Sequence, residues 1–278
     1  MIYSFGGLPY DLGARTRIMG ILNVTPDSFS DGGRYTDRTT AVEHALEMAG
    51  EGADFIDIGG ESTRPGATPV APDVEIRRVV PVIEALAAKS GIPISVDTRN
   101  ADVAERALGA GASIVNDISG LRHDPRMAGV VGTRGGSAVL MHMRGTSATM
   151  QDDPRYDDLI GEIRTCFLDS IRLATDAGIR QIILDPGIGF GKTTGHNLEI
   201  LSRLGEFADL GYPLMVGPSR KAFVGAILEL PVGERLEGTI GASVAAVMRG
   251  ARLLRVHDVR EVSRAVRIAD AILARNHA

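Results

Sequence analysis

Polar residues that could form a small-molecule site recur at the ends of short apolar runs in this sequence. They are Asn23, Asp57, Asp97, Asn116, Asp185, Arg255 and His257. Carboxylate, amide, guanidinium and imidazole groups together supply the acceptors, donors and charges that bind and activate polar substrates. Asp and Asn at such positions can also simply cap the helix that follows. Because they follow six different runs, a shared site is the better interpretation.

The apolar runs themselves are predicted to be strands, and amphipathic stretches with helical spacing separate them. The runs cover about 17–24, 54–59, 93–97, 113–117, 136–141, 181–185, 213–217 and 252–257. Strands that are apolar along their whole length are typical of a parallel sheet covered by helices. Eight strand–helix repeats in 278 residues favour an α/β fold with one closed (β/α)8 TIM barrel, in which the carboxyl ends of the strands converge on one face.

The chain reads as one domain over residues 1–278, since no linker rich in Pro and Ser divides it. Residues 1–16 carry turn signals at 6–7 and at Gly13, which predict a small N-terminal hairpin that closes the bottom of the barrel. Pro81 interrupts a helical stretch and is expected either to kink that helix or to mark its start.

Composition excludes several classes of protein. Lys and Arg number 30 against 35 Asp and Glu, and the net charge of −5 argues against a nucleic-acid or anionic-membrane partner. The single cysteine, Cys166, excludes an internal disulfide and a cysteine-based zinc cluster, and its helical context predicts a core position. With no apolar run long enough to span a bilayer and no leader-like N-terminus, we expect a cytoplasmic protein.

Three polar loops follow strand ends, at 23–33, 59–67 and 185–193. The first two are dense in hydroxyls and small residues, as is typical of loops that close over a substrate. The third looks like a phosphate-binding P-loop, but Pro186 stands where that motif requires glycine, and Gly187 is one residue too close to Lys192. A P-loop is therefore not expected.

These loops and several strand ends resemble one family closely. The motifs are LNVTPDSFSDGG (22–33), GGESTRPGA (59–67), SVDT (95–98), VNDISG (115–120), LDPGIGFGK (184–192), SRKAFVG (219–225) and RVHDV (255–259). In this order, from about residue 17 to 270, they are similar to the dihydropteroate synthases, a family of pterin-binding barrels. The first two motifs are long and specific.

The resemblance implies a transferase of folate biosynthesis that is a sulfonamide target. Such an enzyme condenses (7,8-dihydropterin-6-yl)methyl diphosphate with 4-aminobenzoate and releases 7,8-dihydropteroate and pyrophosphate. The resemblance further implies Mg²⁺ held by Asn23 and a homodimer. The late helix that contains residues 243–248 could form the dimer face, or could equally belong to the core.

The resemblance also assigns roles to individual residues. By this resemblance, Asp97 and Lys221 would be the catalytic pair. The pterin pocket is expected to comprise Asp97, Asn116, Asp185 and Lys221, with Ile118, Met141 and Phe190 as apolar walls. The diphosphate ligands would be Thr63, Arg255 and His257. The aminobenzoate pocket would involve Phe29, Asp31, Arg64, Pro65 and Ser219.

Simpler interpretations exist for some of these residues. Ile118 and Met141 could be ordinary barrel core, and Asp185 could form a structural ion pair with Lys221. The spacing of Arg255 and His257 supports anion binding, because residues i and i+2 of a strand share one face.

The sequence departs from the family pattern at two positions. Ala222 stands where many relatives carry serine, and Ile188 replaces a common aromatic residue. The first change removes a hydroxyl near the expected aminobenzoate pocket, so it bears on affinity for aminobenzoate and sulfonamides rather than on the reaction.

Three other functions share parts of this pattern. A pterin-dependent methyltransferase acting on a corrinoid protein would share the pterin pocket but would not need the 59–67 loop or the Arg255–His257 pair. A catalytically silent pterin-binding paralogue is excluded only by assay. An unrelated phosphate-binding barrel would not need Asp97, Asn116 and Asp185 together.

Overall fold

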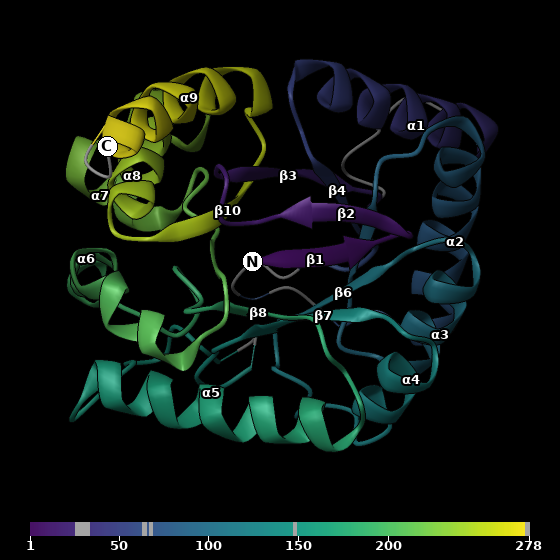
Figure 1. The fold of residues 1–278 in the computed structure, drawn as a ribbon, viewed down its shortest axis with the longest axis horizontal. Coiled ribbons are helices and arrows are strands. Elements are labelled where there is room, and N and C mark those ends of the chain that lie inside the picture. The colour runs from purple at the N-terminus through teal and green to yellow at the C-terminus, as the bar shows by residue number, and fades with distance from the viewer. Residues whose placement is uncertain (26–33, 63–65, 67–68, 147–148, 276–278) are drawn as a thin grey trace.

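The computed structural model describes residues 1–25, 34–62, 66, 69–146 and 149–275. Eight parallel strands close into a barrel in the order β10-β3-β4-β5-β6-β7-β8-β9 (Figure 1). The strands are β3 (Arg17–Asn23), β4 (Phe55–Gly59), β5 (Ile94–Asp97), β6 (Ile114–Asp117), β7 (Ser137–Met141), β8 (Ile182–Asp185), β9 (Leu214–Val216) and β10 (Ala251–Val256). Each lies within two residues of a predicted run, and the predicted TIM barrel is confirmed.

Helices surround the strands as an outer ring (Figure 1). They are α1 (Arg34–Glu51), α2 (Pro72–Lys89), α3 (Ala101–Gly109), α4 (Met127–Thr133), α5 (Leu159–Asp176), α6 (Thr194–Arg203), α7 (Ala222–Leu228), α8 (Leu236–Met248) and α9 (Val259–Arg275), with short 3₁₀ segments η2 (Leu204–Leu210) and η3 (Val232–Glu234). Helix α2 starts at Pro72, where a proline costs no hydrogen bond, and Pro81 lies inside the helix rather than at its start. The predicted core position of Cys166 is confirmed in α5.

The two ends of the barrel interior differ in polarity. At the amino-terminal end, one layer of apolar side chains fills the centre: Met19, Phe55, Ile114, Val139, Ile183, Met215 and Leu253. Successive inward positions in a strand are two residues apart. The next inward positions toward the carboxyl end are therefore Ile21, Asp57, Asn116, Met141, Asp185, Gly217 and Arg255. The strands thus present an entirely apolar floor below and, above it, a layer in which four of the seven positions are polar or charged.

The N-terminal hairpin closes the floor of the barrel, as predicted. Strands β1 (Ile2–Phe5) and β2 (Leu8–Asp11) pair antiparallel around a turn at Gly6 and Gly7, which adopt φ of 57° and 81°. The Phe5 ring packs edge-on against Phe55, with centroids 5.0 Å apart, and the Tyr3 hydroxyl donates a 2.8 Å hydrogen bond to the Ile182 carbonyl.

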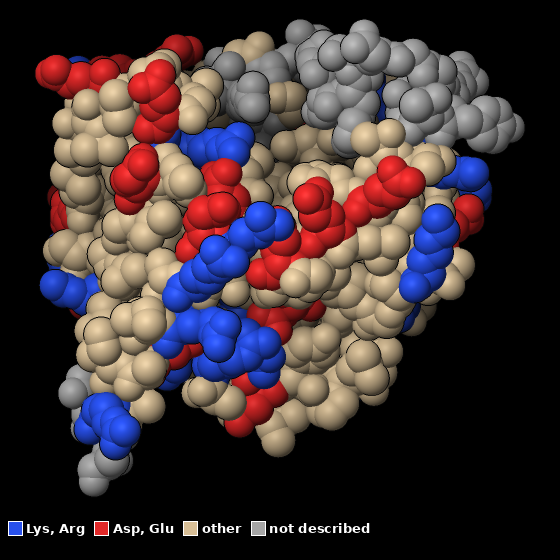
Figure 2. Space-filling view, turned by 90° about the horizontal axis from the view of Figure 1, so that it is seen from above, with Lys and Arg blue, Asp and Glu red and all other residues tan. Residues whose placement is uncertain are grey.

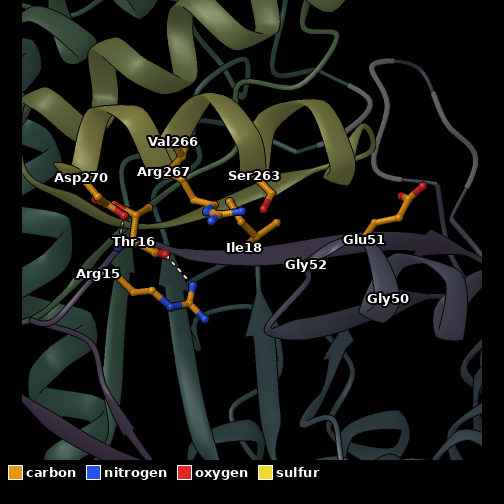
Figure 3. A pocket seen from close by; sticks show the side chains of 10 residues that line it. All are labelled: Arg15, Thr16, Ile18, Gly50, Glu51, Gly52, Ser263, Val266, Arg267 and Asp270. Carbon is orange, nitrogen blue, oxygen red and sulfur yellow. Dashed lines mark hydrogen bonds between the residues drawn. The ribbon is translucent and has the colours of Figure 1, made fainter. Parts of the chain in front are cut away.

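A cavity of about 400 Å³ lies outside the barrel, between α1, α9 and the start of β3 (Figure 3). Asp270 accepts hydrogen bonds from the backbone N–H and the hydroxyl of Thr16, at 3.0 and 2.8 Å, and so ties α9 to the entry of β3. None of the predicted site residues lines this cavity. The hydrogen bonds between Thr16 and Asp270 connect α9 to the start of β3, which indicates a structural role for the residues around this cavity.

The face formed by α1 and α9 carries interleaved acidic and basic side chains (Figure 2).

Among the described residues, no helix is both long enough and apolar enough to cross a membrane.

Removal of the Phe5 ring should destabilise the barrel. Phe5 is fully buried, and a buried Phe→Ala change costs about 3–5 kcal/mol because it leaves a cavity. We expect Phe5→Ala to lower the urea midpoint accordingly. Ile2→Ala, in the same strand but 77% exposed, should change the free energy of unfolding by less than about 0.5 kcal/mol. Equal effects of the two changes would show that the hairpin does not seal the floor.

Candidate active site

The polar strand-end residues converge at the carboxyl-terminal mouth of the barrel. In the strand register, Asn23 pairs with Gly59, Gly59 with Asp97, and Asp97 with Asn116. Gly59 has no side chain, and a Cβ there would lie 3.8 Å from both Asn23 Oδ1 and Asp97 Oδ2. The glycine therefore leaves space between an amide oxygen and a carboxylate oxygen on the two flanking strands.

Arg255 bridges two buried carboxylates across this mouth. Its Nε donates to Asp57 Oδ2 at 2.6 Å, and its Nη2 donates to Asp97 Oδ2 at 2.7 Å. The Asn116 amide donates to the same Asp57 oxygen at 3.0 Å. The other oxygens, Asp57 Oδ1 and Asp97 Oδ1, are buried and have no hydrogen-bond partner within the described residues. Such oxygens are expected to accept hydrogen bonds from a ligand.

The ionisation of this network reflects opposing effects. Burial raises the pKa of Asp97 to about 7, although the adjacent Arg255 guanidinium opposes the rise. For Arg255, burial acts to lower the pKa, but the Asp57 and Asp97 carboxylates outweigh it and raise the pKa. Arg255 is therefore a permanent cation, and it favours the ionised form of the carboxylates beside it.

Asp185 and Lys221 occupy the opposite side of the mouth. Asp185 Oδ1 accepts a 2.7 Å hydrogen bond from the Gly187 N–H, and burial raises its pKa to about 6. The Lys221 ammonium lies 3.9 Å above the Phe190 ring, and burial together with Arg255 lowers its pKa to about 8. Nitrogen and oxygen of the two groups do not approach within 4.0 Å, so this pair of described residues is not a direct ion pair. Both charges remain available to a ligand.

The predicted apolar walls form one cluster at the same mouth. Ile118, Met141 and Phe190 pack together with Met150, and the partly buried Met143 borders them. This cluster is separate from both the floor and the larger core around the barrel. The cluster is therefore distinct from the ordinary barrel core, and it lies beside Lys221 and Asp185.

His257 and Ser219 are in direct contact, although the sequence placed them in different parts of the site. The Ser219 hydroxyl lies 3.0 Å from His257 Nδ1 and accepts a 3.2 Å hydrogen bond from the His257 backbone N–H. Burial, followed by the Arg255 charge, lowers the pKa of His257 to about 3. A neutral imidazole whose Nδ1 accepts a hydrogen bond from the serine carries its proton on Nε2. The Nε2–H group can then donate a hydrogen bond to an anion.

Several predicted residues need separate mention. Phe29, Asp31, Thr63, Arg64 and Pro65 lie outside the described residues. Within the described part of the chain, no cluster of three or more His, Cys, Asp or Glu is suited to a metal ion.

The two departures from the family pattern occupy different environments. Ala222 is exposed in the first turn of α7, next to Lys221, whereas Ile188 is buried in the core around the barrel. The isoleucine therefore fills core space.

Asp57 is a site residue that the predicted binding set omitted. It is fully buried and accepts hydrogen bonds from both Arg255 and Asn116. The sequence does contain a signal for Asp57. It stands two residues after Phe55 near the end of a strand, and residues two apart in a strand point to the same side, here the inside of the barrel.

Comparison with known proteins identifies the class that this barrel and mouth define. A family model described as pterin binding enzyme matches residues 19–257. The dihydropteroate synthase of Bacillus subtilis is 48% identical over 261 residues, covering 93% of this chain and 89% of the relative.

Two crystal structures are similar throughout. The Yersinia pestis dihydropteroate synthase with a sulfonamide drug complex is 44% identical with a TM-score of 0.93, covering 99% of this chain and 100% of that one. The Xanthomonas albilineans dihydropteroate synthase with 4-aminobenzoic acid is 43% identical with a TM-score of 0.91, covering 98% of both chains. The chain belongs to the pterin binding enzyme family and, within it, to the dihydropteroate synthases, which are transferases of folate biosynthesis.

Loss of the Arg255 charge should destabilise the protein. Arg255→Met leaves Asp57 and Asp97 buried without a cation, and breaking a buried ion pair in this way costs about 3–5 kcal/mol. We expect a lower urea midpoint. The double variant that also carries Asp57→Asn should recover part of the lost free energy of unfolding. The exposed Arg264→Met is the matched control. An Arg255→Met protein as stable as the parent would contradict the structural importance of the bridge.

Proposed function

We propose that this mouth binds the pterin ring of (7,8-dihydropterin-6-yl)methyl diphosphate and joins its methylene carbon to the nitrogen of 4-aminobenzoate. The observation that carries the proposal is the set of buried carboxylates with free acceptor capacity beside an apolar wall. A pterin edge presents an amino group and a ring N–H side by side. Asp185 would accept both as a bidentate partner, and the Asn116 amide and the Lys221 ammonium would meet the remaining acceptors and donors.

The diphosphate would lie toward Arg255 and His257. Nε and Nη2 of Arg255 are engaged with carboxylates, which leaves its Nη1 for the substrate. The His257 Nε2–H would supply a second donor, and Thr63 a third. These donors stabilise the charge that grows on the departing pyrophosphate.

Bond breaking at the methylene carbon would precede attack. The C–O bond to the diphosphate breaks with its electron pair leaving on pyrophosphate, and a pterin-methyl cation remains. Asp97, with one buried oxygen unpartnered, would favour this cation by charge attraction in a water-poor site. The amine nitrogen of 4-aminobenzoate then forms the C–N bond and loses a proton. Ser219, with Phe29, Asp31, Arg64 and Pro65, would contribute to the aminobenzoate side, where a sulfonamide would also bind.

Asn23 is suited to hold Mg²⁺ in this proposal. Its amide oxygen is a hard donor at the barrel mouth and faces the gap above Gly59. Magnesium commonly takes only one or two protein oxygens and completes its shell with water and substrate phosphates, so the lack of a carboxylate cluster among the described residues suits such a site. When bound, the ion would neutralise charge on the diphosphate.

The proposed function is tested by pyrophosphate release from the purified protein. Release should require dihydropterin diphosphate, 4-aminobenzoate and Mg²⁺ together, and dihydropteroate should form in step. Asp185→Asn should lower kcat/KM for the pterin substrate about 10- to 100-fold, because a hydrogen bond to a charged group contributes about 1.5–3 kcal/mol. Asp169→Asn, on the exposed face of α5, should have no effect.

Other outcomes of the same assay would favour other functions. Pterin binding without turnover would favour the silent paralogue or the corrinoid methyltransferase. Absence of both binding and turnover would overturn the proposal.

We also propose that the protein forms a homodimer through α6, α7 and α8, which lie on one side of the barrel (Figure 1). Large apolar side chains are exposed there: Leu198, Ile227, Leu228, Val232 and Met248. Exposed Gly241 and Ala245 precede Met248 on one stripe of α8 and would allow close helix approach.

Light scattering should give twice the chain mass of 29.4 kDa, and Ile227→Glu should shift the protein toward monomer. A parent protein that is monomeric at micromolar concentration would contradict this proposal. The cytoplasmic location stays a prediction.

A further inference from the structure

Lysine is rare in this chain, and its distribution is uneven. Of the 30 Lys and Arg residues, only Lys89, Lys192 and Lys221 are lysines. Lys89 is exposed at the end of α2, and Lys221 belongs to the proposed pterin site. Lys192 is 3% exposed and has no part in the reaction described above. Because this chain otherwise uses arginine for positive charge, a buried lysine indicates a need for a compact ammonium group.

The Lys192 ammonium meets three acceptors at once. Its Nζ lies 2.9 Å from the Phe190 carbonyl, 3.3 Å from the His142 carbonyl and 3.0 Å from His142 Nδ1. An ammonium carries three N–H donors, so these contacts use all of them. Burial lowers the pKa of Lys192 to about 7, although the Asp185 charge opposes the fall. Burial, reinforced by the Lys192 charge, lowers the pKa of His142 to about 2, so the imidazole is neutral and its Nδ1 accepts from the protonated form of Lys192.

These contacts fasten the loop after β8 to the segment after β7. The carbonyls of three consecutive residues, Gly189, Phe190 and Gly191, are all held by side chains. Gln151 Nε2 donates to the first at 2.9 Å, Lys192 to the second, and the Tyr156 hydroxyl to the third at 2.8 Å.

The fit between the two segments is also close along the backbone. A Cβ at Gly187 would lie 2.0 Å from the His142 carbonyl oxygen, and one at Gly191 would lie 2.6 Å from the Arg144 carbonyl oxygen. Lys192 supplies the only side-chain cation among the described contacts to these loop carbonyls.

The fastened loop carries the pterin-recognition groups. Asp185 begins it and binds the Gly187 N–H, and Phe190 at its centre lies beneath the Lys221 ammonium. We propose that Lys192 is a positioning residue for pterin recognition, whose ammonium ties the loop after β8 to the end of β7 and thereby holds Phe190 and Asp185 in place. This inference rests on the proposed function, since it specifies how the same pocket is kept in shape.

A single substitution separates this role from general stability. Lys192→Met keeps a chain of similar length and removes the ammonium. We expect the Kd for 6-hydroxymethylpterin, measured by calorimetry, and the KM for dihydropterin diphosphate each to rise at least tenfold. The Michaelis constant for the aminobenzoate substrate should stay within twofold. Lys89→Met, the same change at an exposed site, should leave all three values unchanged.

A second measurement uses the unmodified protein and so does not depend on folding of the variant. With only three lysines, selective ¹³Cε labelling of lysine gives three resolvable side-chain NMR signals. Addition of 6-hydroxymethylpterin should shift the Lys192 and Lys221 signals and leave Lys89 unmoved.

The outcomes distinguish this inference from the proposed function. A folded Lys192→Met protein that binds the pterin within twofold of the parent, or an unmoved Lys192 signal in a parent that binds it, overturns the inference alone. A parent protein that does not bind the pterin overturns both.

Discussion

The guanidinium of Arg255, held between the carboxylates of Asp57 and Asp97, is the interaction on which the site depends. These residues come from β10, β4 and β5, so the bridge crosses over β3 at the mouth of the barrel. Each charge alone would be costly to bury, and Arg255 reduces that cost for both carboxylates, although Asp57 and Asp97 repel each other. The packed floor and the hairpin beneath it supply apolar burial that offsets this cost. The apolar layer and the buried charges thus lie at opposite ends of the same strands.

Within the described part of the chain, the bridge also leaves one oxygen of each carboxylate without a hydrogen-bond donor. One oxygen of each carboxylate is engaged and the other is buried without a partner among the described residues. Burying an acceptor in this way is unfavourable until a donor arrives, so the folded protein is preorganised for a ligand rich in N–H groups. A dihydropterin has such groups, and the cation that forms from it would meet the same carboxylate. Under the proposed function, the ring and the cation that forms from it would both draw on the Asp97 carboxylate.

The sequence was sufficient to predict the barrel, its strands and the closing hairpin, because apolar runs and turn residues act locally. It was also sufficient to bring Asp97, Asn116 and Asp185 together, since the ends of parallel strands converge. Contacts between loops had no comparable signal. Nothing in the sequence pairs Ser219 with His257, which follow different strands, or directs Lys192 toward His142. Asp57 was visible as a strand-end residue, but its role emerges only once Arg255 is seen to reach it.

The bridge has a consequence for inhibitors and for escape from them. A compound that fills the proposed pterin pocket would face Asp97, which also takes part in the bridge with Arg255 and Asp57 at the barrel mouth. A substitution that weakens such a compound by altering these residues would lower the free energy of unfolding at the same time. Proteins tolerate only a few kcal/mol of such loss before their abundance falls. Resistance through these positions would therefore be constrained by folding as well as by catalysis.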